Sequence, residues 1–575
     1  MDRRDLLRSA GLLAAGLPAA DRAAGAAPAP APPAPVLPAP VPPAGTAVAP
    51  TLAVLAATPL APGALAFLAE PGREGLFLCA AGRPSAPDPL MGLYVPAAGG
   101  ERHFARVWDG RTGRPEWFGA KVNDGRADCA PAIEACVALC PVTQLGQVDY
   151  FIRRTLVLSH SWRTVYGSGA YATDQGQGTR IILQGSAPGV HDADILLVGS
   201  LTQPGRDNNR FPYEIHLSDF TLIRDGLSAP DASGDLRRYP TGLRAAFLTR
   251  CTFSRIASLE NSVGFYFGGL VYSKVDDCLA QRMNAGVRRA APDLLAHYYL
   301  DGRPDIGLAG GNASLYMNRC VAVGQHPAHV RPAGLVAEGA FVDSFIDRFE
   351  SARVDDGMRF SARGAGGAGQ TIDLHVRHAI LDGCGGTGLE LDLAGTQSAS
   401  VEILDPYMAA SGGGGAAGIV VRDGGGLVTV TGGQVHGDFR DGSLLLRHTR
   451  GVRVQGLKLH DGSRPVAVED SGALQLEPQV SNTHRRTANF AIACARVYRA
   501  SIRPLVIGAP GALGGGVALD GACNYSGVDT SAVDPGCFGE VTSARKLWFG
   551  GADATRGAGL AAFAGRGNVV TGVQG

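Results

Sequence analysis

A repeated apolar pattern in the middle of the chain constrains the fold more than any other feature of the sequence. Apolar or small residues take the first, third, sixth and eighth places of the pattern, as in Val401, Ile403, Pro406 and Met408. Alternating apolar positions are typical of strands, and the two-residue gap marks a bend between two short strands. Nine copies follow one another, beginning at Ile215, Cys251, Ser273, Leu315, Asp347, Leu374, Val401, Val428 and Val452.

The spacing of these copies distinguishes between repeat architectures. Successive copies start 22 to 42 residues apart, and three successive intervals measure 27 residues. A third strand-like segment separates most copies, for example GLELDL at 388–393 and GIVVRD at 418–423. A propeller blade needs four strands and about 40 residues, and a leucine-rich repeat has its own leucine and asparagine consensus. Three short strands per coil, stacked in register, instead predict an all-β fold, the parallel β-helix.

Composition supports this prediction and excludes some partners. The 81 glycines among 575 residues argue against long helices and for many turns. Lys and Arg together number 52, as do Asp and Glu, so no net basic charge favours binding to nucleic acid. We therefore expect no nucleic-acid partner.

The first residues are typical of an export signal. Arg3 and Arg4 precede a short, weakly apolar stretch that ends in small residues, the pattern of a twin-arginine signal over residues 1–26. A spanning helix needs about 20 continuous apolar residues, and Arg8 and Ser9 interrupt this stretch. We expect export to the periplasm or the cell exterior and no membrane anchor.

The remaining chain divides by composition. Alanine and proline dominate residues 27–50, which predicts an extended linker, and residues 51–114 form a small β-rich segment. The β-helix is predicted over 115–509, followed by a glycine-rich C-terminal segment, 510–575, without an interpretable motif. Eleven cysteines lack the spacing of a zinc site. Cys523 and Cys537 are the pair for which a disulfide is predicted, and simple burial is expected for most of the others.

One segment connects the chain to a known superfamily. WFGAKVNDGRADCAPAIEACVALC, from Trp117 to Cys140, resembles the opening of pectate lyase-like right-handed β-helix proteins, in which an amphipathic helix caps the first coil. Phage tailspike depolymerases share this opening. The apolar face predicted for the capping helix consists of Ala132, Ile133, Cys136, Val137 and Cys140. The resemblance implies a right-handed β-helix, a polysaccharide substrate and, as in many relatives, homotrimeric assembly.

The repeat also predicts which outward side chains share a column, because neighbouring coils lie about 4.8 Å apart. The position after each copy holds Asp355, Asp382, Ala409, His436 and His460 in turn. Asp355 and Asp382 are therefore predicted to stack, with Asp356 beside them. His436 is expected to converge with these acids as a further candidate catalytic residue. Two close carboxylates share a proton or a cation, which raises the pKa of one of them.

The third strand of each coil supplies further candidate catalytic residues. Its outward positions hold Arg359, then Glu390 and Asp392, then Arg422, and then Arg447 on successive coils. Glu390 and Asp392 point the same way about 7 Å apart, near the separation of the two acids in inverting glycosidases. The same residues also fit a ladder of surface ion pairs, Arg359 with Glu390 and Asp392 with Arg422, that contributes little.

Long insertions provide candidate substrate-binding residues. Tyr298 and Tyr299 lie in one insertion and Arg331 at the end of another, and with Arg447 they are predicted to contact sugar rings or carboxylates. Loops that pack on a coil or on another subunit are the alternative.

Two classes of function fit this sequence. We expect an enzyme that depolymerises a polysaccharide, either a lyase acting at a uronate or a glycoside hydrolase. No cofactor or metal site is predicted, although a uronate lyase would use Ca²⁺. The alternative is a non-catalytic, glycan-binding or structural spike-like protein.

Overall fold

A computed structural model describes residues 46–171, 177–184, 193–200, 211–226, 235–281, 294–302, 311–324, 331–362, 370–538 and 546–572. The export signal predicted at residues 1–26 lies outside this range, as does the linker up to residue 45. Within the described residues, no helix is both long and apolar enough to cross a membrane.

A five-stranded sheet precedes the β-helix, as predicted. Its order is β1-β2-β3-β5-β4, and its apolar side chains, among them Leu55, Phe77 and Phe104, form a separate core. The sheet begins earlier than residue 51, because β1 lies in the segment predicted as linker and pairs in parallel with β2. The elements are β1 (Ala47–Ala49), α2 (Leu52–Ala57), β2 (Leu65–Leu68), β3 (Gly75–Ala81), β4 (Tyr94–Pro96) and β5 (Arg102–Arg106).

The capping helix α3 (Ala130–Leu139) closes the first coil on the face that the sequence predicts. Ala132, Ile133, Cys136, Val137 and Cys140 are all buried. Two short elements precede α3. Strand β6 (Thr112–Gly113) pairs with β7, the first strand of the β-helix, and the 3-10 helix η1 (Pro115–Phe118) follows it. The cap therefore covers the apolar end of the stack of coils.

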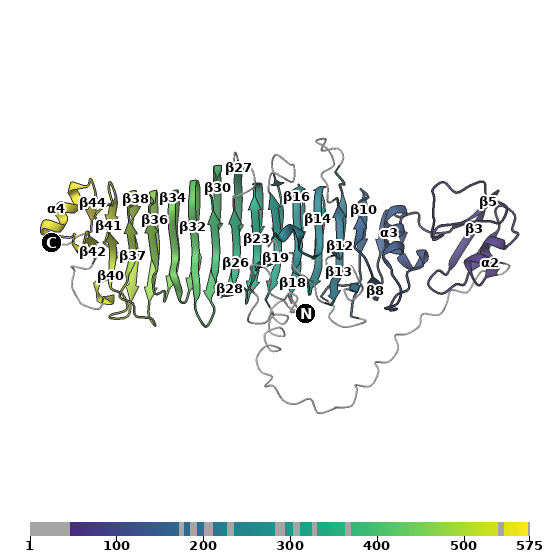
Figure 1. Ribbon diagram of the computed structural model, residues 1–575, viewed down its shortest axis with the longest axis horizontal. Helices are drawn as coiled ribbons and strands as arrows, with labels where there is room; N and C mark the ends of the chain where they lie inside the picture. Colours follow the sequence, from purple (N-terminus) through teal and green to yellow (C-terminus); the bar gives the residue numbers. More distant parts are fainter. Residues whose placement is uncertain are drawn as a thin grey trace, which may run out of the picture. The chain divides into compact units, whose positions relative to one another are not determined.

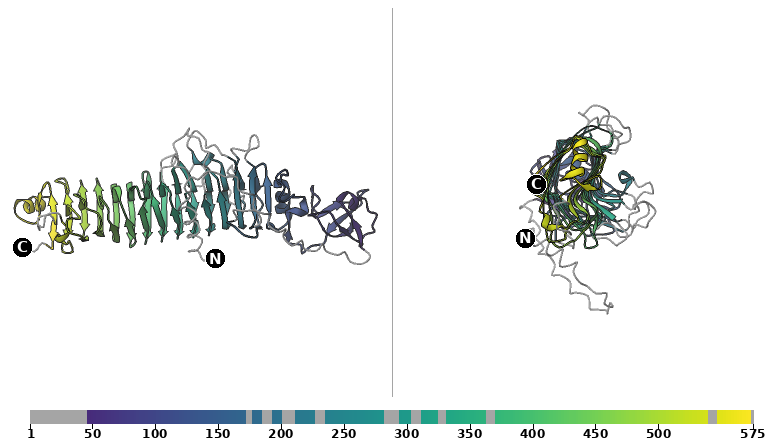
Figure 2. Two further views of the ribbon diagram at one scale, coloured as in Figure 1. Left: turned by 90° about the horizontal axis from the view of Figure 1, so that it is seen from below. Right: turned by 90° about the vertical axis from the view of Figure 1, so that its left-hand side faces the viewer.

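The remaining strands form a parallel β-helix with three columns of strands, and Figure 1 shows them stacked in chain order. Viewed along the stack, the coils surround one common interior (Figure 2, right). The first column contains β7 (Val142–Gln144), β10 (Arg163–Tyr166), β13 (Ile215–Asp225), β15 (Thr252–Leu259), β17 (Lys274–Asp276), β21 (Tyr316–Asn318), β24 (Phe341–Asp347), β27 (Gln370–Arg377), β30 (Thr396–Leu404), β38 (Tyr498–Ile502), β41 (Gly527–Asp529) and β44 (Val569–Thr571).

The second and third columns complete each coil. The second contains β8 (Asp149–Ile152), β11 (Arg180–Gln184), β18 (Leu279–Gln281), β22 (Val321–Val323), β25 (Glu350–Ala352), β28 (Ile380–Cys384), β31 (Tyr407–Ala410), β33 (Gln434–His436) and β39 (Leu505–Gly508). The third contains β9 (Leu156–Leu158), β12 (Leu196–Gly199), β14 (Thr241–Thr249), β16 (Val263–Val271), β19 (Leu294–Gly302), β23 (Arg331–Gly339), β26 (Asp356–Ser361), β29 (Thr387–Asp392), β35 (Val466–Glu469), β37 (Phe490–Ala495), β40 (Gly515–Leu519) and β42 (Leu547–Phe549).

Long strands turn corners and join more than one column. They are β32 (Gly415–Thr431), β34 (Phe439–His460) and β36 (Gly472–Asn482), while β13 and β15 each bend from the first column into the second. Shorter elements fill the corners and the end of the stack: η3 (Leu236–Arg238), β20 (Asn312–Ala313), η5 (Pro535–Cys537), β43 (Ala552–Asp553) and α4 (Gly557–Gly565).

The register of the strands confirms eight of the nine copies of the repeat. Val401 pairs with Val428 and Val428 with Val452, and Met408 with Val435 in the second column. The fifth copy is shifted by three residues. Its inward positions are Ser344, Ile346, Phe349 and Ser351, not the set that starts at Asp347. Two serines occupy inward positions of this coil, where the repeat leads one to expect apolar residues. Matching the pattern to the apolar residues nearby therefore predicted the wrong register.

The C-terminal boundary predicted at residue 510 is wrong, because the coils continue beyond it. β40 pairs in parallel with β37, and β42 pairs with β40. Small residues such as Gly515 and Ala518 line these coils, which hides the apolar alternation. All eleven cysteines are free and buried, so the disulfide predicted between Cys523 and Cys537 is not formed.

Candidate functional site

The strongest candidate site lies on the outward face of three neighbouring third-column strands, β26, β29 and the first part of β32. Arg359 pairs with Glu390, Ser361 with Asp392, and Asp392 with Arg422. Met358, Leu389 and Ile419 alternate with these residues and point into the core. Inward burial thus fixes which side chains point outward, and the predicted stacking of these residues is confirmed.

Two arginines join the outward side chains into one cluster. Nε of Arg359 lies 3.3 Å from Oε2 of Glu390, and Nε of Arg422 lies 2.8 Å from Oε1 of the same carboxylate. Nη2 of Arg422 also lies 3.1 Å from Oδ2 of Asp392. Glu390 is therefore held between two guanidinium groups, one from the coil before it and one from the coil after it.

Asp356 is the fifth member of this carboxylate–arginine cluster, which comprises Asp356, Arg359, Glu390, Asp392 and Arg422. Its Oδ1 accepts a hydrogen bond from the backbone N–H of Thr387 at 2.8 Å, and its Oδ2 lies 3.4 Å from Nη1 of Arg359. Burial raises the pKa of the Asp356 carboxyl above its ordinary value, and the charges of Asp355 and Glu390 add to this rise. The hydrogen bond and Arg359 oppose it. Asp356 thus differs from Glu390 in environment, although one arginine contacts both.

A glycine turn makes room for this carboxyl. A Cβ atom at Gly386 would lie 2.4 Å from Oδ1 of Asp356, closer than any real contact. Gly386 also donates its N–H to the carbonyl oxygen of Asp355 at 2.7 Å. The turn between β28 and β29 therefore packs directly against Asp356.

The predicted stacking of Asp355 on Asp382 is wrong, and the shifted fifth copy explains the error. Asp382 pairs with Ala352 in the second column, and its carbonyl oxygen accepts the N–H of Arg353 at 3.0 Å. Asp355 lies three residues after Ala352 in the sequence, beside Asp356 and Gly386. Asp355 is thus an electrostatic neighbour of the cluster, whereas Asp382 belongs to another strand column.

His436 does not join the acidic residues, contrary to the sequence-based expectation. It lies on β33 in the second column, where its ring stacks on that of His460 with centroids 4.5 Å apart. Its Nε2 lies 2.9 Å from Oε1 of Gln434. Burial, together with the neighbouring charge of His460, lowers the pKa of His436. This pair forms a separate surface feature.

The histidine stack is expected to make the stability of the protein depend slightly on pH. The pKa of His436 is lower in the folded chain than its ordinary value of 6.5, so the folded protein holds the neutral imidazole more favourably than the unfolded chain does. Above pH 6.5 neutral His436 makes its full contribution to stability. That contribution is lost as the pH falls through the pKa of the folded state, because the unfolded chain takes up the proton first. We expect the melting temperature to decrease slightly between pH 7.5 and pH 5. His460→Gln should reduce this dependence, and an unchanged pH profile in that variant would contradict the assignment.

Arg447 continues the column beyond Arg422, but the character of the face changes there. Nε of Arg447 lies 3.0 Å from Oε2 of Glu469, so a separate ion pair engages it. The outward positions beside it, Val420, Leu445 and Ala467, form a small buried apolar cluster. Arg447 therefore marks the end of the polar site.

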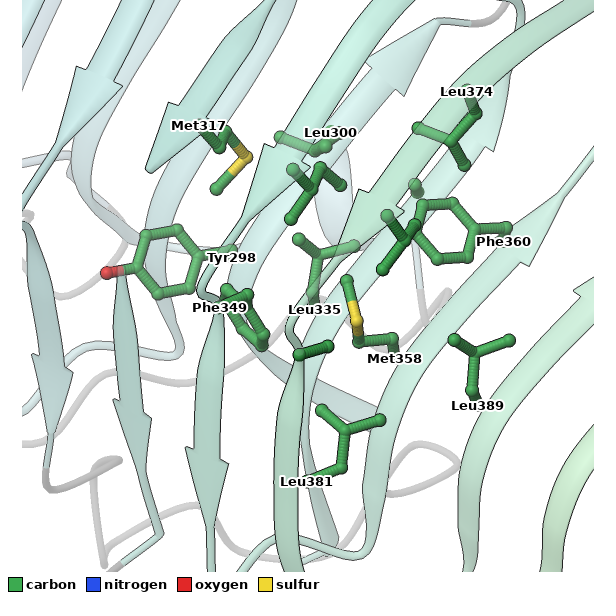
Figure 3. Close-up of a cluster of buried hydrophobic side chains, with 14 of the residues drawn as sticks. Tyr298, Leu300, Met317, Leu335, Phe349, Met358, Phe360, Leu374, Leu381 and Leu389 are labelled. Atoms are coloured by element: carbon green, nitrogen blue, oxygen red, sulfur yellow. The ribbon is translucent and has the colours of Figure 1, made fainter. Parts of the chain in front are cut away.

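The prediction that Tyr298 contacts sugar is wrong. Tyr298 is 0% exposed, and its ring stacks on Phe265 with centroids 5.0 Å apart. Figure 3 shows it inside the core with Phe349 and Leu335. The insertion predicted here contains strand β19, in which Tyr298 takes an inward position.

Tyr299 points outward but is also 0% exposed, so its predicted contact with sugar is wrong as well. A second apolar cluster, with Phe211 and Tyr239 among its members, covers it. Its hydroxyl donates to Oε2 of Glu338 at 2.6 Å. Arg331 begins β23, and its side chain lies outside the described residues.

Two further acids in the same column were missed by the sequence analysis. Asp301 on β19 pairs with Glu338 on β23, which precedes Ser361 and Asp392 in the column. Tyr266 donates a hydrogen bond to Oδ2 of Asp301 at 2.9 Å. The segments HYYLDG and GLVAEG alternate as GLELDL does, so aligning all three would have revealed these acids. The irregular spacing of the repeat between β18 and β26 hid this alignment.

Comparison with known proteins identifies the fold. No protein-family model matches the chain, and no curated protein sequence does. Among solved structures, a mutant tailspike protein of E. coli bacteriophage HK620 in complex with a pentasaccharide has a TM-score of 0.58 and 12% identity. The match covers 83% of this chain and 85% of that one. This protein has the fold of phage tailspike proteins.

One further tailspike structure supports this fold. A second HK620 tailspike mutant, in complex with a hexasaccharide, has a TM-score of 0.57 at 13% identity over 83% of this chain and 84% of that one. Tailspike protein 3 of bacteriophage CBA120 is more distant, with a TM-score of 0.40 and 14% identity over 80% and 61% of the two chains. The tailspike-like β-helix predicted from residues 117–140 is thus confirmed, and the sequence identities are low enough that the likeness concerns the fold alone.

Proposed function

We propose that the protein hydrolyses a polysaccharide and that the carboxylate–arginine cluster carries out the reaction. The observation that carries this proposal is the difference between two neighbouring acids. The raised pKa of Asp356 keeps its carboxyl protonated to higher pH, as a general acid requires. Glu390 has its charge balanced by two arginines. Different environments for two acids in one site separate the roles of acid and base.

We assign inversion of configuration to this reaction. One guanidinium group, that of Arg359, contacts the carboxyl groups of both Asp356 and Glu390. Inverting enzymes separate their acids by about 6.5–9.5 Å to admit a water molecule, whereas retaining enzymes hold them about 5–5.5 Å apart. In this proposal Asp356 protonates the leaving oxygen, and Glu390 activates the water.

The charge of the cluster favours hydrolysis over β-elimination at a uronate. Four carboxyl groups, those of Asp356, Glu390, Asp392 and Asp423, surround the guanidinium groups of Arg359 and Arg422. Both arginines are engaged by these carboxylates and are poorly placed to act as a base or to neutralise a uronate. A neutral glycan suits such a site better than a polyanion does.

The fold supports a polysaccharide substrate. The HK620 tailspike proteins were solved with a pentasaccharide and a hexasaccharide, so a β-helix of this kind binds oligosaccharides. A role outside the cytoplasm, through the export signal at residues 1–26, and homotrimeric assembly remain parts of the proposal.

A panel of neutral and uronate-containing polysaccharides tests the reaction class. We expect new reducing ends from a neutral polysaccharide, without the ultraviolet absorbance of an unsaturated uronate, and the same rate in EDTA as in Ca²⁺. Absorbance together with reducing ends would show a lyase instead. Loss of activity in EDTA would show that a cation takes part, contrary to the proposal.

A second candidate function is glycan binding without catalysis, and another set of ion pairs favours it. His448 lies 3.2 Å from Oδ1 of Asp423 and 3.5 Å from Oδ2 of Asp470, and Asp470 also pairs with Arg496. Ion pairs therefore also link successive coils beside the carboxylate–arginine cluster, as they would in a ladder with a purely structural role. Polysaccharide binding without release of reducing ends by any member of the panel would support this alternative.

A further inference from the structure

Large aromatic side chains line one corner of the first coils. Trp162 and Tyr272 are each 61% exposed, and Tyr213 and Tyr316 are 37% and 40% exposed. The N–H of Trp162 donates to the carbonyl oxygen of Tyr213 at 3.0 Å, and that of Tyr272 to Ala313 at 3.0 Å. On the coils between these two pairs, the backbone N–H of Glu214 donates to the carbonyl oxygen of Thr249, and that of Arg250 donates to the carbonyl oxygen of Val271. Trp162, Tyr213 and Tyr272 therefore follow one corner from coil to coil, and Tyr316 lies beside this corner, at the start of a first-column strand.

Ring contacts hold the aromatic side chains in place both at this corner and in the adjoining first column. Nε1 of Trp162 donates to the hydroxyl of Tyr213 at 3.2 Å, and the two rings meet edge to face with centroids 5.2 Å apart. Tyr316 stacks on Phe345 at 5.2 Å, and Phe345 stacks on His375 at 4.5 Å. We call Trp162, Tyr213, Tyr272, Tyr316, Phe345 and His375 the aromatic row.

Charged side chains accompany the aromatic row. Arg250 lies at the corner between Tyr213 and Tyr272, Lys274 pairs with Tyr316 in the first column, and Asp343 lies at the corner two residues before Phe345. All three are exposed. A surface of apolar rings beside hydrogen-bonding groups suits a sugar, which has an apolar C–H face and a rim of hydroxyl groups.

The same features argue against a protein partner. The cores of protein interfaces are depleted in charged residues, and a stable interface buries about 800 Å² on each partner. A row one or two residues wide, with arginine, lysine and aspartate beside the rings, fits an extended chain better than a broad surface.

We propose that the aromatic row is a second glycan-binding surface, separate from the carboxylate–arginine cluster. The row runs along the corner at which the first column begins and continues onto β21, β24 and β27 of that column, whereas the cluster lies on the third column. The inference rests on the proposed function in that both surfaces take the same neutral polysaccharide. The row holds the polymer through stacking contacts, while the cluster cleaves it.

Binding is tested without turnover, so that the two proposals can fail separately. Each polysaccharide of the panel is cast into a native gel, and the retardation of the Asp356→Asn protein is compared with that of the same protein carrying Trp162→Ala and Tyr272→Ala. We expect the apparent affinity for at least one neutral polysaccharide to fall at least tenfold. In the protein that keeps Asp356, the same two substitutions should change kcat/KM for a short oligosaccharide much less, by about tenfold less than they change the affinity for the polysaccharide.

A matched control lies at the far end of the same corner. Tyr525 is 70% exposed and separated from the row by Leu427, Gly451, Ala473 and Arg499. Tyr525→Ala should leave retardation unchanged. Equal retardation with and without Trp162 and Tyr272 would overturn the proposal. So would a change in sedimentation coefficient in the double variant, which would identify the row as an interface between copies of the chain. Absence of oligosaccharide turnover in the wild-type protein would instead refute the hydrolase.

Discussion

Asp356→Asn is expected to lower kcat by about 10²–10⁴-fold, with little change in KM. The amide has nearly the shape of the carboxyl group, and its oxygen can still accept the N–H of Thr387, which lies 2.8 Å from Oδ1. It cannot deliver a proton to the leaving oxygen. Initial rates of reducing-end release over a range of substrate concentrations measure both constants.

The pH dependence of the rate should change with this substitution. Because burial raises the pKa of Asp356, the wild-type carboxyl stays protonated and active to higher pH than an exposed aspartate. The rate then falls as the pH rises through this pKa. This alkaline limb should be absent from the residual activity of the Asn variant. A wild-type profile without such a limb would remove Asp356 from the role of general acid.

Loss of activity in this variant should not reflect loss of folding. A raised pKa means that the folded protein binds the proton of Asp356 more tightly than the unfolded chain does. Ionisation of Asp356 therefore destabilises the fold above the ordinary pKa of aspartate. The neutral amide removes that penalty, so the melting temperature at pH 7 should stay equal or rise.

Asp347→Asn provides a control of matched chemistry. Asp347 lies in the first column and pairs with His378 at 3.0 Å, away from the cluster. This variant should retain wild-type turnover. If Asp356→Asn keeps more than a tenth of the wild-type kcat, Asp356 is not the acid, and the half-buried Glu338 in the same column becomes the next candidate.

The sequence predicted most of the fold because burial imposes a strict period on it. Each inward residue, such as Val428 or Val435, contacts its equivalents in the coils before and after it, so apolar identity recurs at matching positions. The same constraint placed Arg359, Glu390 and Asp392 correctly on the outward face. The outward positions could be predicted only because the inward residues beside them in the strand follow the apolar pattern.

The failures occur where that constraint is weak. Ser344 and Ser351 fill inward positions without an apolar signal, which moved the predicted register by three residues and placed Asp355 on Asp382. In β19, Tyr298 points inward and is buried in the main core, whereas Tyr299 points outward and is buried by a second apolar cluster. Local alternation does not reveal what covers an outward residue, because the covering residues come from a distant part of the chain.

Tyr298→Ala should destabilise the protein by about 3–5 kcal/mol, because it removes a buried aromatic ring. The ring lies beside Phe349 in the core (Figure 3) and meets it edge to face. It also stacks on Phe265, and its hydroxyl donates to the carbonyl oxygen of Cys278 at 2.6 Å. Thermal melts and the rate of unfolding measure the loss. Tyr298→Phe keeps the stacking and removes only the hydroxyl's hydrogen bond, while that carbonyl still accepts the N–H of Val321 at 2.8 Å. A smaller loss of about 0.5–1.5 kcal/mol is therefore expected. In both variants the folded protein should keep its KM. A raised KM with an unchanged melting temperature would instead show that Tyr298 contacts substrate.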